Sequence, residues 1–297
     1  MARRPCAGGS PAPATGHSTE CTGQPQGHHV ARLPQPLRGG ATAPRLPRTS
    51  ITGFRCRSPV PDLRVVCREA APRALDGSAS PLFVWRDGIG PPGRGELHVW
   101  WAVLPDLARG HGADAGALSS DERRRMAGFV RAEDARRFGL ARGFLRALLG
   151  SYLGVPAGDL RFEYGPHGKP ALPGAIEFSL SHAGDLLAVA VGVDRAVGVD
   201  VEKSASSPDI LALARRYFCP DEYRWLLARE GADQTDQFFR IWTRKEAYLK
   251  ARGVGIGAIS SCPSVLDDTV SDGYSLADLP VHRDSRAAVA AGPIAET

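Results

Sequence analysis

Residues 175–203 read AIEFSLSHAGDLLAVAVGVDRAVGVDVEK, and this stretch decides the expected fold. Its segments AIEFSLS, LLAVAVGV and AVGVDVE are rich in β-branched and small apolar residues, a composition that favours buried strands. The Ser-His-Ala-Gly sequence between the first two segments suits a turn. The stretch therefore predicts three successive strands, the last of which ends in the acidic pair Asp200 and Glu202.

Further elements are predicted on both sides of this stretch. Upstream, ELHVWWAVL (96–104) is strand-like and ends at Pro105, and SSDERRRMAGF (119–129) begins as a helix capped by Ser119 or Ser120. Residues 132–154 have an apolar stripe at helical spacing, made of Phe138, Leu145, Leu148, Leu149 and Tyr152. Downstream, residues 209–218, 220–230 and 234–253 are predicted helices, the last closed by Gly253, and residues 286–292 a strand.

This order of elements predicts an α+β fold of two halves of comparable size that meet around residues 190–200. We assign residues 96–192 to the N-terminal half and 193–297 to the C-terminal half. The sequence shows no clear internal repeat that would support symmetry between the halves.

The N-terminal segment has a different composition from the rest of the chain. Residues 1–60 contain nine prolines, eight glycines, eight arginines and one acid, with no helical or alternating period. Such a segment buries too little apolar surface to offset its ordering entropy, so we predict that residues 1–80 form a disordered leader. Ordered structure is expected from about Glu96, and residues 61–94 are not assigned further. A dispensable extension, or a start codon assigned too far upstream, is favoured over an organellar transit peptide, because the prolines prevent an amphipathic helix.

Charge and cysteine content restrict the class of protein. The net charge of +5 suggests a nucleic-acid or membrane partner, but residues 1–60 carry +7 and the remainder −2, so neither partner is expected. The six cysteines show no CxxC pair and no zinc-finger spacing, which favours free thiols and a cytoplasmic location. No apolar stretch is long enough for a membrane span or a signal peptide.

Two groups of charged residues suggest chemistry near the C-terminus. On a strand, Asp200 and Glu202 project from one face, and two adjacent carboxylates are relieved by a hard cation such as Mg²⁺. On a helix, Glu246 and Lys250 lie one turn apart beside Trp242. Taken singly, the first pair is better explained by an exposed strand with two solvated acids, and the second by a surface ion pair.

Two loops offer groups suited to phosphate. SLSHAG (179–184) supplies hydroxyl, imidazole and backbone amide groups, and GPHGKP (165–170) presents Lys169 from a tight loop. SLSHAG is not a nucleophile elbow, because the flanking glycines of that motif are absent. Ordinary turn chemistry also explains each loop by itself.

The order and spacing of these motifs are far more specific than any one of them. GKP, FSLSHAG, GVDVEK and WTRKEAYLKARG, in this order, resemble the motif series of the 4′-phosphopantetheinyl transferase superfamily, surfactin-synthetase-activating type. The resemblance extends from about Glu96 to the C-terminus and includes PDEY (220–223). It implies two similar α+β halves in one chain, a pseudo-dimer with coenzyme A in the cleft between them. The long leader and a shortened stretch between Gly257 and His282 depart from the family pattern.

The resemblance also implies roles for individual residues. Asp200, Glu202 and Glu246 match the acidic Mg²⁺ positions. Glu246 also matches the proposed base, and Lys250 matches the lysine that steadies the pyrophosphate and the leaving adenosine bisphosphate. The positions that match contacts to coenzyme A are Arg125, Arg137, Lys169, Pro170, Ser181, His182, Asp200 and Lys250.

The implied activity is Mg²⁺-dependent transfer of 4′-phosphopantetheine from coenzyme A to a serine of an apo acyl or peptidyl carrier protein, by a monomeric enzyme. Polyketide or peptide synthases are the expected users. A dedicated fatty-acid carrier enzyme is an alternative, although such enzymes are usually short trimeric chains. A catalytically silent homologue that only binds carriers is the second alternative, and the intact acids and lysine argue against it.

Overall fold

The structure is a computed structural model that describes residues 54–56, 63–69, 90–110, 117–174, 176–204, 209–281 and 284–294. The predicted disorder of residues 1–53 lies outside this part of the chain and stays a prediction. The strands are β1 Phe54–Cys56, β2 Arg64–Glu69, β3 Glu96–Val103, β4 Glu163–Tyr164, β5 Pro170–Ala171, β6 Ile176–Ala183, β7 Leu186–Val193, β8 Val197–Lys203, β9 Ser275–Asp278 and β10 Ser285–Ala291. The α-helices are α1 Leu104–Gly110, α2 Ser120–Ala127, α3 Ala132–Leu153, α4 Ile210–Tyr217, α5 Pro220–Leu227 and α6 Gly231–Arg252. Two 3-10 helices, η1 Ala157–Asp159 and η2 Ile256–Ser261, follow α3 and α6.

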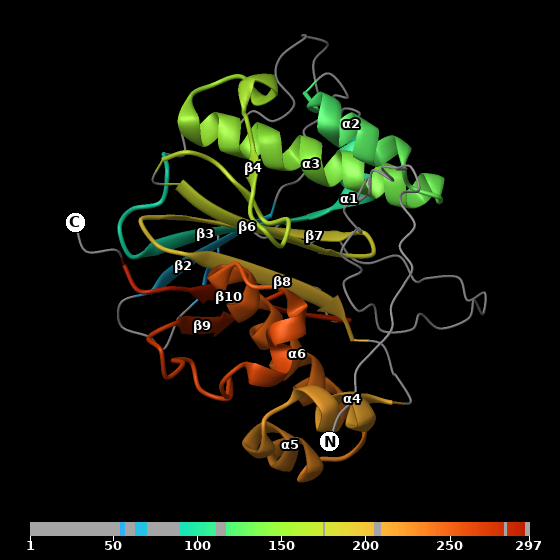
Figure 1. The fold of residues 1–297 in the computed structure, drawn as a ribbon, viewed down its shortest axis with the longest axis vertical. Helices are drawn as coiled ribbons and strands as arrows, with labels where there is room; N and C mark the ends of the chain where they lie inside the picture. The colour runs from blue at the N-terminus through green and yellow to red at the C-terminus, as the bar shows by residue number, and fades with distance from the viewer. Residues whose placement is uncertain are drawn as a thin grey trace, which may run out of the picture.

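Two sheets pack against each other between the two long helices α3 and α6 (Figure 1). One sheet has the strand order β1-β2-β3-β7-β6 and the other β8-β10-β9, with β4 and β5 forming a separate hairpin. All neighbouring strands are antiparallel except β2 and β3, which are parallel. The α+β class predicted from the sequence is confirmed.

Burial on both faces explains the continuous apolar sequence of β7. Alternate side chains of a strand point to opposite faces, so a strand covered on both sides needs apolar residues throughout. Those of β7 that pack with α3 are Leu187, Val189 and Val191. Those that pack against the other sheet are Leu186, Ala188 and Ala190.

The two halves repeat one topology. Apart from β1, β2 and the β4-β5 hairpin of the first half, each runs strand, three α-helices and two strands. In each sheet the first of these strands pairs with the last, which pairs with the middle one: β3-β7-β6 and β8-β10-β9. Strand β7 of the first half ends at Val193 and β8 begins at Val197. Two similar α+β halves, expected from the resemblance, are therefore confirmed.

Two buried ion pairs, one in each half, show that this symmetry extends to side chains. In the first half, Glu122 caps the start of α2 and binds Arg146 of α3 with an Nε–Oε2 distance of 2.6 Å. In the second half, Glu222 accepts from the Cys219 amide at the start of α5 and binds Lys245 of α6 with an Nζ–Oε2 distance of 2.9 Å. Both pairs are almost completely buried. This repeat is not evident in the sequence, because the buried cation is an arginine in one half and a lysine in the other.

Two segments differ from the prediction. Strand β2 lies inside the segment predicted to be a disordered leader, and Leu63, Val65 and Cys67 are buried against the second sheet. Buried apolar residues alternate with more exposed ones along this strand, which pairs with β3, so the prediction of disorder is wrong for residues 63–69. In the SLSHAG segment, the residues through Ala183 still belong to β6, and the turn begins only at Gly184. The shortened stretch before the C-terminus still supplies β9, with four residues.

Candidate functional site

The packing of strand β8 against helix α6 determines the geometry of the site. Val197, Val199 and Val201 pack between the sheets, so the alternate residues Gly198, Asp200 and Glu202 face α6. A Cβ on Gly198 would lie 1.9 Å from the carbonyl oxygen of Ala247, closer than any real contact. Glycine at position 198 therefore lets the helix approach the strand, and the two acids of β8 lie directly against α6.

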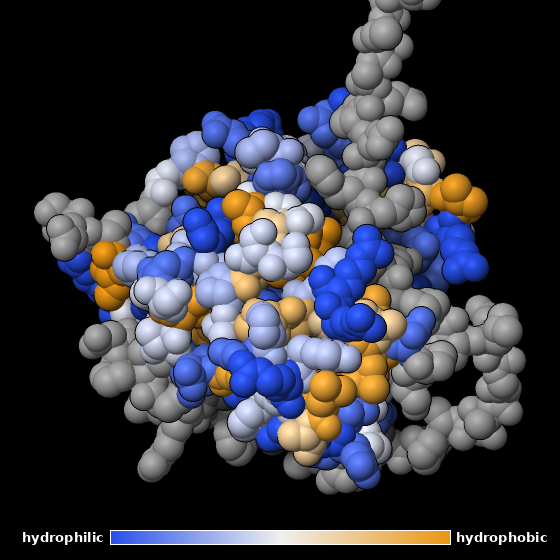
Figure 2. Space-filling view, turned by 60° about the horizontal axis from the view of Figure 1, so that its bottom comes forward, coloured by the Kyte–Doolittle hydropathy of each residue, from blue (hydrophilic) through white to orange (hydrophobic). Residues whose placement is uncertain are grey.

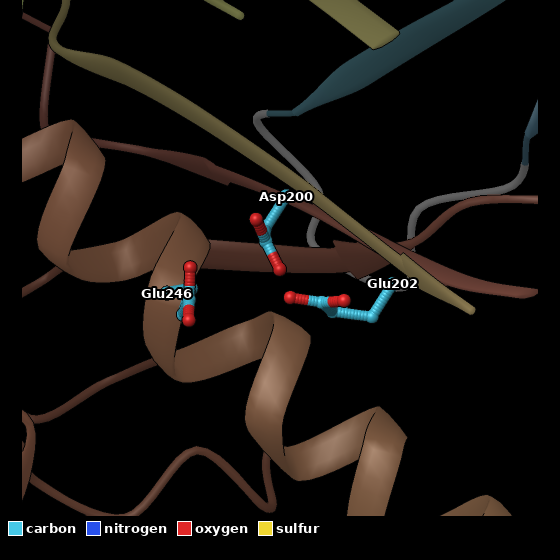
Figure 3. A group of neighbouring side chains, drawn as sticks. All are labelled: Asp200, Glu202 and Glu246. Carbon is cyan, nitrogen blue, oxygen red and sulfur yellow. The ribbon is translucent and has the colours of Figure 1, made fainter. Parts of the chain in front are cut away.

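This approach gathers three carboxylates (Figure 3). Asp200 and Glu202 come from β8 and Glu246 from α6, and each offers an oxygen within 4.8 Å of the others. Asp200 is 1% exposed and Glu246 4% exposed, whereas Glu202 is only partly buried. Among the described residues, this is the only group of three or more potential metal ligands.

Lys250 supplies the positive charge of the site. Its Nζ lies 2.6 Å from Asp200 Oδ1 and 3.9 Å from Glu246 Oε2. Ser181 of β6 completes the arrangement, because its Oγ accepts from Lys250 Nζ at 2.9 Å and donates to Asp200 Oδ1 at 2.9 Å. The carboxylate of Asp200 raises the pKa of Lys250 against the opposing effect of burial, so the side chain is an ammonium.

The negative charge of the three carboxylates is only partly balanced by the ammonium of Lys250. Three acids face one ammonium, and Asp200 Oδ2 and Glu246 Oε1 are buried without a hydrogen-bond partner. Burial, and next the charge of Asp200, raise the pKa of Glu246 well above its ordinary value. Carboxylate oxygens from several side chains are the ligands that a hard divalent cation takes, and the unpartnered oxygens of Asp200 and Glu246 lie in such a group, so the residues fit a Mg²⁺ ion.

Lys169 links the first half to the strand that carries the acids. It follows the loop 165–168, and its Nζ donates to the carbonyl of Val197 at 2.9 Å. Burial lowers the pKa of Lys169. In the same loop, the His167 ring lies 3.0 Å from where a Cβ on Gly255 would be, just beyond the end of α6. The loop therefore bridges the two halves next to both α6 and β8.

The other predicted coenzyme contacts are spread more widely. Pro170 is partly buried in β5, and His182 is exposed on the face of β6 opposite Ser181. Arg125 is exposed on α2 against the ring of Phe138. Arg137 donates to Asp185 in the β6–β7 turn at 2.8 Å. The role of these four residues as coenzyme contacts stays a prediction.

Lys245, next to Glu246 in sequence, is buried in the scaffold and does not face the acidic cluster. Its side chain is fully buried, bound to Glu222 and close to the carbonyl oxygens of Cys262 and Pro263. Successive helix residues are rotated by about 100°, so Glu246 faces β8 while Lys245 faces α5 and the segment after η2. When α3 and α6 are aligned on the buried cations Arg146 and Lys245, Ala147 and Ser151 stand where α6 has Glu246 and Lys250. The first half thus repeats the scaffold without the charged site.

Comparisons with known proteins agree with this geometry. A model of the 4′-phosphopantetheinyl transferase superfamily matches residues 196–288, and a model of the 4′-phosphopantetheinyl transferase N-terminal family matches residues 111–193. The chain is 39% identical over 179 residues to the 4′-phosphopantetheinyl transferase HetI of Nostoc sp., covering 59% of this chain and 76% of that protein.

Two further relatives come from Bacillus. The 4′-phosphopantetheinyl transferase Sfp of Bacillus subtilis is 32% identical over 141 residues, which are 47% of this chain and 62% of Sfp. The 4′-phosphopantetheinyl transferase psf-1 of Bacillus pumilus is 37% identical over 153 residues, which are 50% of this chain and 63% of the relative.

None of the helices in the described part of the chain is both long and apolar enough to cross a membrane. In the same part of the chain, Cys67, Cys219 and Cys262 form no disulfide. With both halves matched by family models in the expected order, and with relatives that share the name, the chain belongs to the 4′-phosphopantetheinyl transferase superfamily.

Proposed function

We propose that this protein transfers 4′-phosphopantetheine from coenzyme A to a serine of an apo carrier protein in a Mg²⁺-dependent reaction. The observation that supports this most strongly is the cluster of Asp200, Glu202 and Glu246 beside the ammonium of Lys250. Transfer to a serine breaks a pyrophosphate and displaces an anion, and such a reaction depends on positive charge and on a base at one place.

The three acids of the cluster would hold the metal ion. When bound there, Mg²⁺ would neutralise the pyrophosphate and make the bridging oxygen a better leaving group. Asp200 is already oriented for this role, because Lys250 and Ser181 both bind its Oδ1 and leave its buried Oδ2 without a partner.

Glu246 is the proposed base. In the reaction, the serine oxygen of the carrier forms a bond to the β-phosphorus of coenzyme A, and the bond from that phosphorus to the bridging oxygen breaks. The serine proton passes to Glu246, and adenosine 3′,5′-bisphosphate leaves with the electron pair of the broken bond. A carboxylate is a weak base for a serine hydroxyl, so Glu246 would act through its fixed position beside the reacting atoms.

Lys250 is the proposed stabiliser of the leaving group. Its ammonium is 30% exposed at the side chain, whereas Asp200 beside it is buried, so Lys250 reaches from the cluster toward solvent. Charge that develops on the leaving phosphate would meet a fixed cation there. Ser181 binds Asp200 and Lys250 in the cluster, and Lys169 binds the backbone of β8 at Val197; both support the proposed binding of the coenzyme at the junction of the two halves.

A surface beyond the cluster supports a macromolecular partner. A pocket of about 540 Å³ is lined by Leu211, Ala212, Arg215, Arg216 and Tyr223. These residues belong to α4 and α5, at the end of the molecule turned toward the viewer in Figure 2, where apolar and strongly hydrophilic side chains are intermixed. Apolar and arginine side chains around one hollow suit an acidic, partly apolar helix of a carrier. We further propose polyketide or peptide synthase carriers as substrates, a monomeric enzyme and a cytoplasmic location.

The experiment combines the purified full chain with coenzyme A, MgCl₂ and a panel of apo acyl and peptidyl carriers. The expected result is a mass gain of one phosphopantetheine on at least one carrier, absent when EDTA replaces MgCl₂. A carrier whose acceptor serine is changed to alanine is the matched control. No mass gain on any carrier at any Mg²⁺ concentration would contradict the proposal.

A further inference from the structure

Arg286 of β10 lies directly across from Glu202 of β8, because the two residues are paired in the antiparallel ladder between these strands. Residues paired in this way have side chains on the same face, with Cβ atoms about 4.5–5.5 Å apart. This face is turned toward α6, since Ala288 and Ala290, the alternate residues of β10, pack in the core that α6 forms. The acidic cluster therefore has a second cation nearby, in addition to Lys250.

The two opposed side chains nevertheless point to different partners. The carboxylate of Glu202 extends toward those of Asp200 and Glu246, the other members of the acidic cluster (Figure 3). The guanidinium of Arg286 instead forms an ion pair with Asp236 of α6. Opposite charges that face each other across a ladder attract and like charges repel, so an arrangement that gathers Glu202 with two other acids needs a cause.

Asp236 supplies that cause. It precedes Glu246 by ten residues, or about 15 Å along the axis of α6, so its carboxylate draws the guanidinium of Arg286 away from the acidic cluster. Arg240, one turn further along α6 than Asp236, is bound to Asp278 of β9 with an Nε–Oδ2 distance of 2.9 Å. The side chains of Asp236 and Arg286 are 32% and 37% exposed, so their ion pair is partly shielded from solvent.

We infer that Asp236 is a positioning residue that keeps Arg286 from pairing with Glu202, and that it thereby keeps Glu202 available to a divalent cation. The inference rests on the proposed function, in which the acidic cluster holds Mg²⁺. A guanidinium binds a carboxylate through two parallel N–H donors, so Arg286 paired with Glu202 would compete with the ion for the same oxygens. Neither Asp236 nor Arg286 belongs to the motifs of the sequence.

A simple electrostatic effect of the two charges makes a different prediction. Asp236 adds a negative charge and Arg286 a positive charge near the cluster, and each charge alone would shift the affinity for a cation. Such shifts are independent of each other and add. Asp236 can restrain Arg286, in contrast, only when the arginine is present, so the restraint appears as a non-additive term in a double-mutant cycle.

The test measures the binding of Mn²⁺ to the full chain, from the electron paramagnetic resonance signal of the free ion. Mn²⁺ takes the same carboxylate ligands as Mg²⁺. Asp236→Asn should weaken the binding about tenfold, the size typical of changes to residues that orient metal ligands. Arg286→Met should bind Mn²⁺ at least as tightly as the wild type. Adding Asp236→Asn to Arg286→Met should then change the affinity by less than about twofold.

Asp233→Asn is the matched control, since it removes an acid from the same helix that pairs with Arg229, and it should keep the wild-type affinity. Both members of the Asp236–Arg286 pair are partly exposed, so the variants should fold. Turnover gives a second measurement: Asp236→Asn should need more Mg²⁺ for half-maximal turnover, and excess Mg²⁺ should restore the rate because the ion then displaces the arginine.

Wild-type affinity for Mn²⁺ in Asp236→Asn would overturn the inference alone. An equal loss of affinity from Asp236→Asn with and without Arg286 would do the same, because it would show a simple electrostatic effect. A wild type that binds no Mn²⁺ would contradict the proposed function as well.

Discussion

Gly198 of β8 and Ala247 of α6 are in direct backbone contact, so that a Cβ on Gly198 would lie 1.9 Å from the Ala247 carbonyl oxygen. The contact sets the distance between the strand that carries two of the acids and the helix that carries the third. The glycine of the GVDVE motif is therefore a positioning residue for the acidic cluster.

Gly198→Ala is expected to destabilise the fold by at least about 3 kcal/mol, because backbone atoms of α6 cannot move aside as a flexible side chain would. Chemical denaturation with urea measures this loss. Gly257→Ala is the control, since a Cβ at position 257 would meet nothing within 4 Å. Equal stability of the two variants would show that α6 does not pack on β8 as described.

Lys245 lies on the same helix as Lys250 but should matter for the stability of the fold and not for turnover. Lys245→Met removes one partner of a fully buried ion pair and is expected to cost about 3–5 kcal/mol of stability, because Glu222 is left unpaired. Denaturation curves of Lys245→Met and of the double variant Lys245→Met/Glu222→Leu check this. The double variant should recover part of the loss. If Lys245→Met unfolds at the wild-type urea concentration but lacks turnover, Lys245 belongs to the site and not to the scaffold.

Truncation tests the N-terminal boundary. A protein that starts at residue 54 should keep the wild-type stability, since the sequence of residues 1–53 gives no reason for a packed structure. A protein that starts at residue 80 lacks β2 and the buried Leu63, Val65 and Cys67, and should lose roughly 4 kcal/mol or more. Melting temperatures of the two truncated proteins decide the question. Equal values would mean that β2 adds nothing to the fold.

Metal binding should depend on the two acids of β8. Mg²⁺ is expected to raise the melting temperature of the wild type, because a ligand that binds only the folded state stabilises it. The double variant Asp200→Ala/Glu202→Ala should fold and show no rise with Mg²⁺. The control is Asp221→Ala, which removes an exposed acid at the start of α5 and should leave the response unchanged. A Mg²⁺ response of wild-type size in the double variant would place the ion elsewhere.

Local sequence patterns predicted most of the fold. The apolar runs of β6, β7 and β8, the capped start of α2 at Ser119 and the end of α6 at Gly253 are all where the sequence predicts them. These features depend on neighbouring residues, so periodicity and capping rules reach them. The α3 stripe from Phe138 to Tyr152 is likewise buried as predicted.

Features that depend on distant partners were not accessible from the sequence. Strand β2 pairs with β3, some thirty residues later. The repeat of the two halves is not evident in the sequence, because the buried ion pair contains an arginine in one half and a lysine in the other. In the site, spacing predicted that Asp200 and Glu202 share a face and that Glu246 and Lys250 lie one turn apart, and the structure agrees. That Ser181 binds Asp200 and Lys250, and that Lys245 faces away from the site, required the packing of α6 on β8.

The central claim is that Glu246 acts in catalysis and that Lys250 acts in both binding and catalysis. Glu246→Gln keeps the size of the side chain and removes its charge, and Lys250→Ala removes the ammonium beside Asp200. The measurement is steady-state turnover with coenzyme A, Mg²⁺ and an apo carrier, paired with coenzyme A affinity from calorimetry. We predict that Glu246→Gln lowers turnover by about 100-fold or more with little change in affinity, and that Lys250→Ala lowers both. Wild-type turnover in both variants would contradict the account.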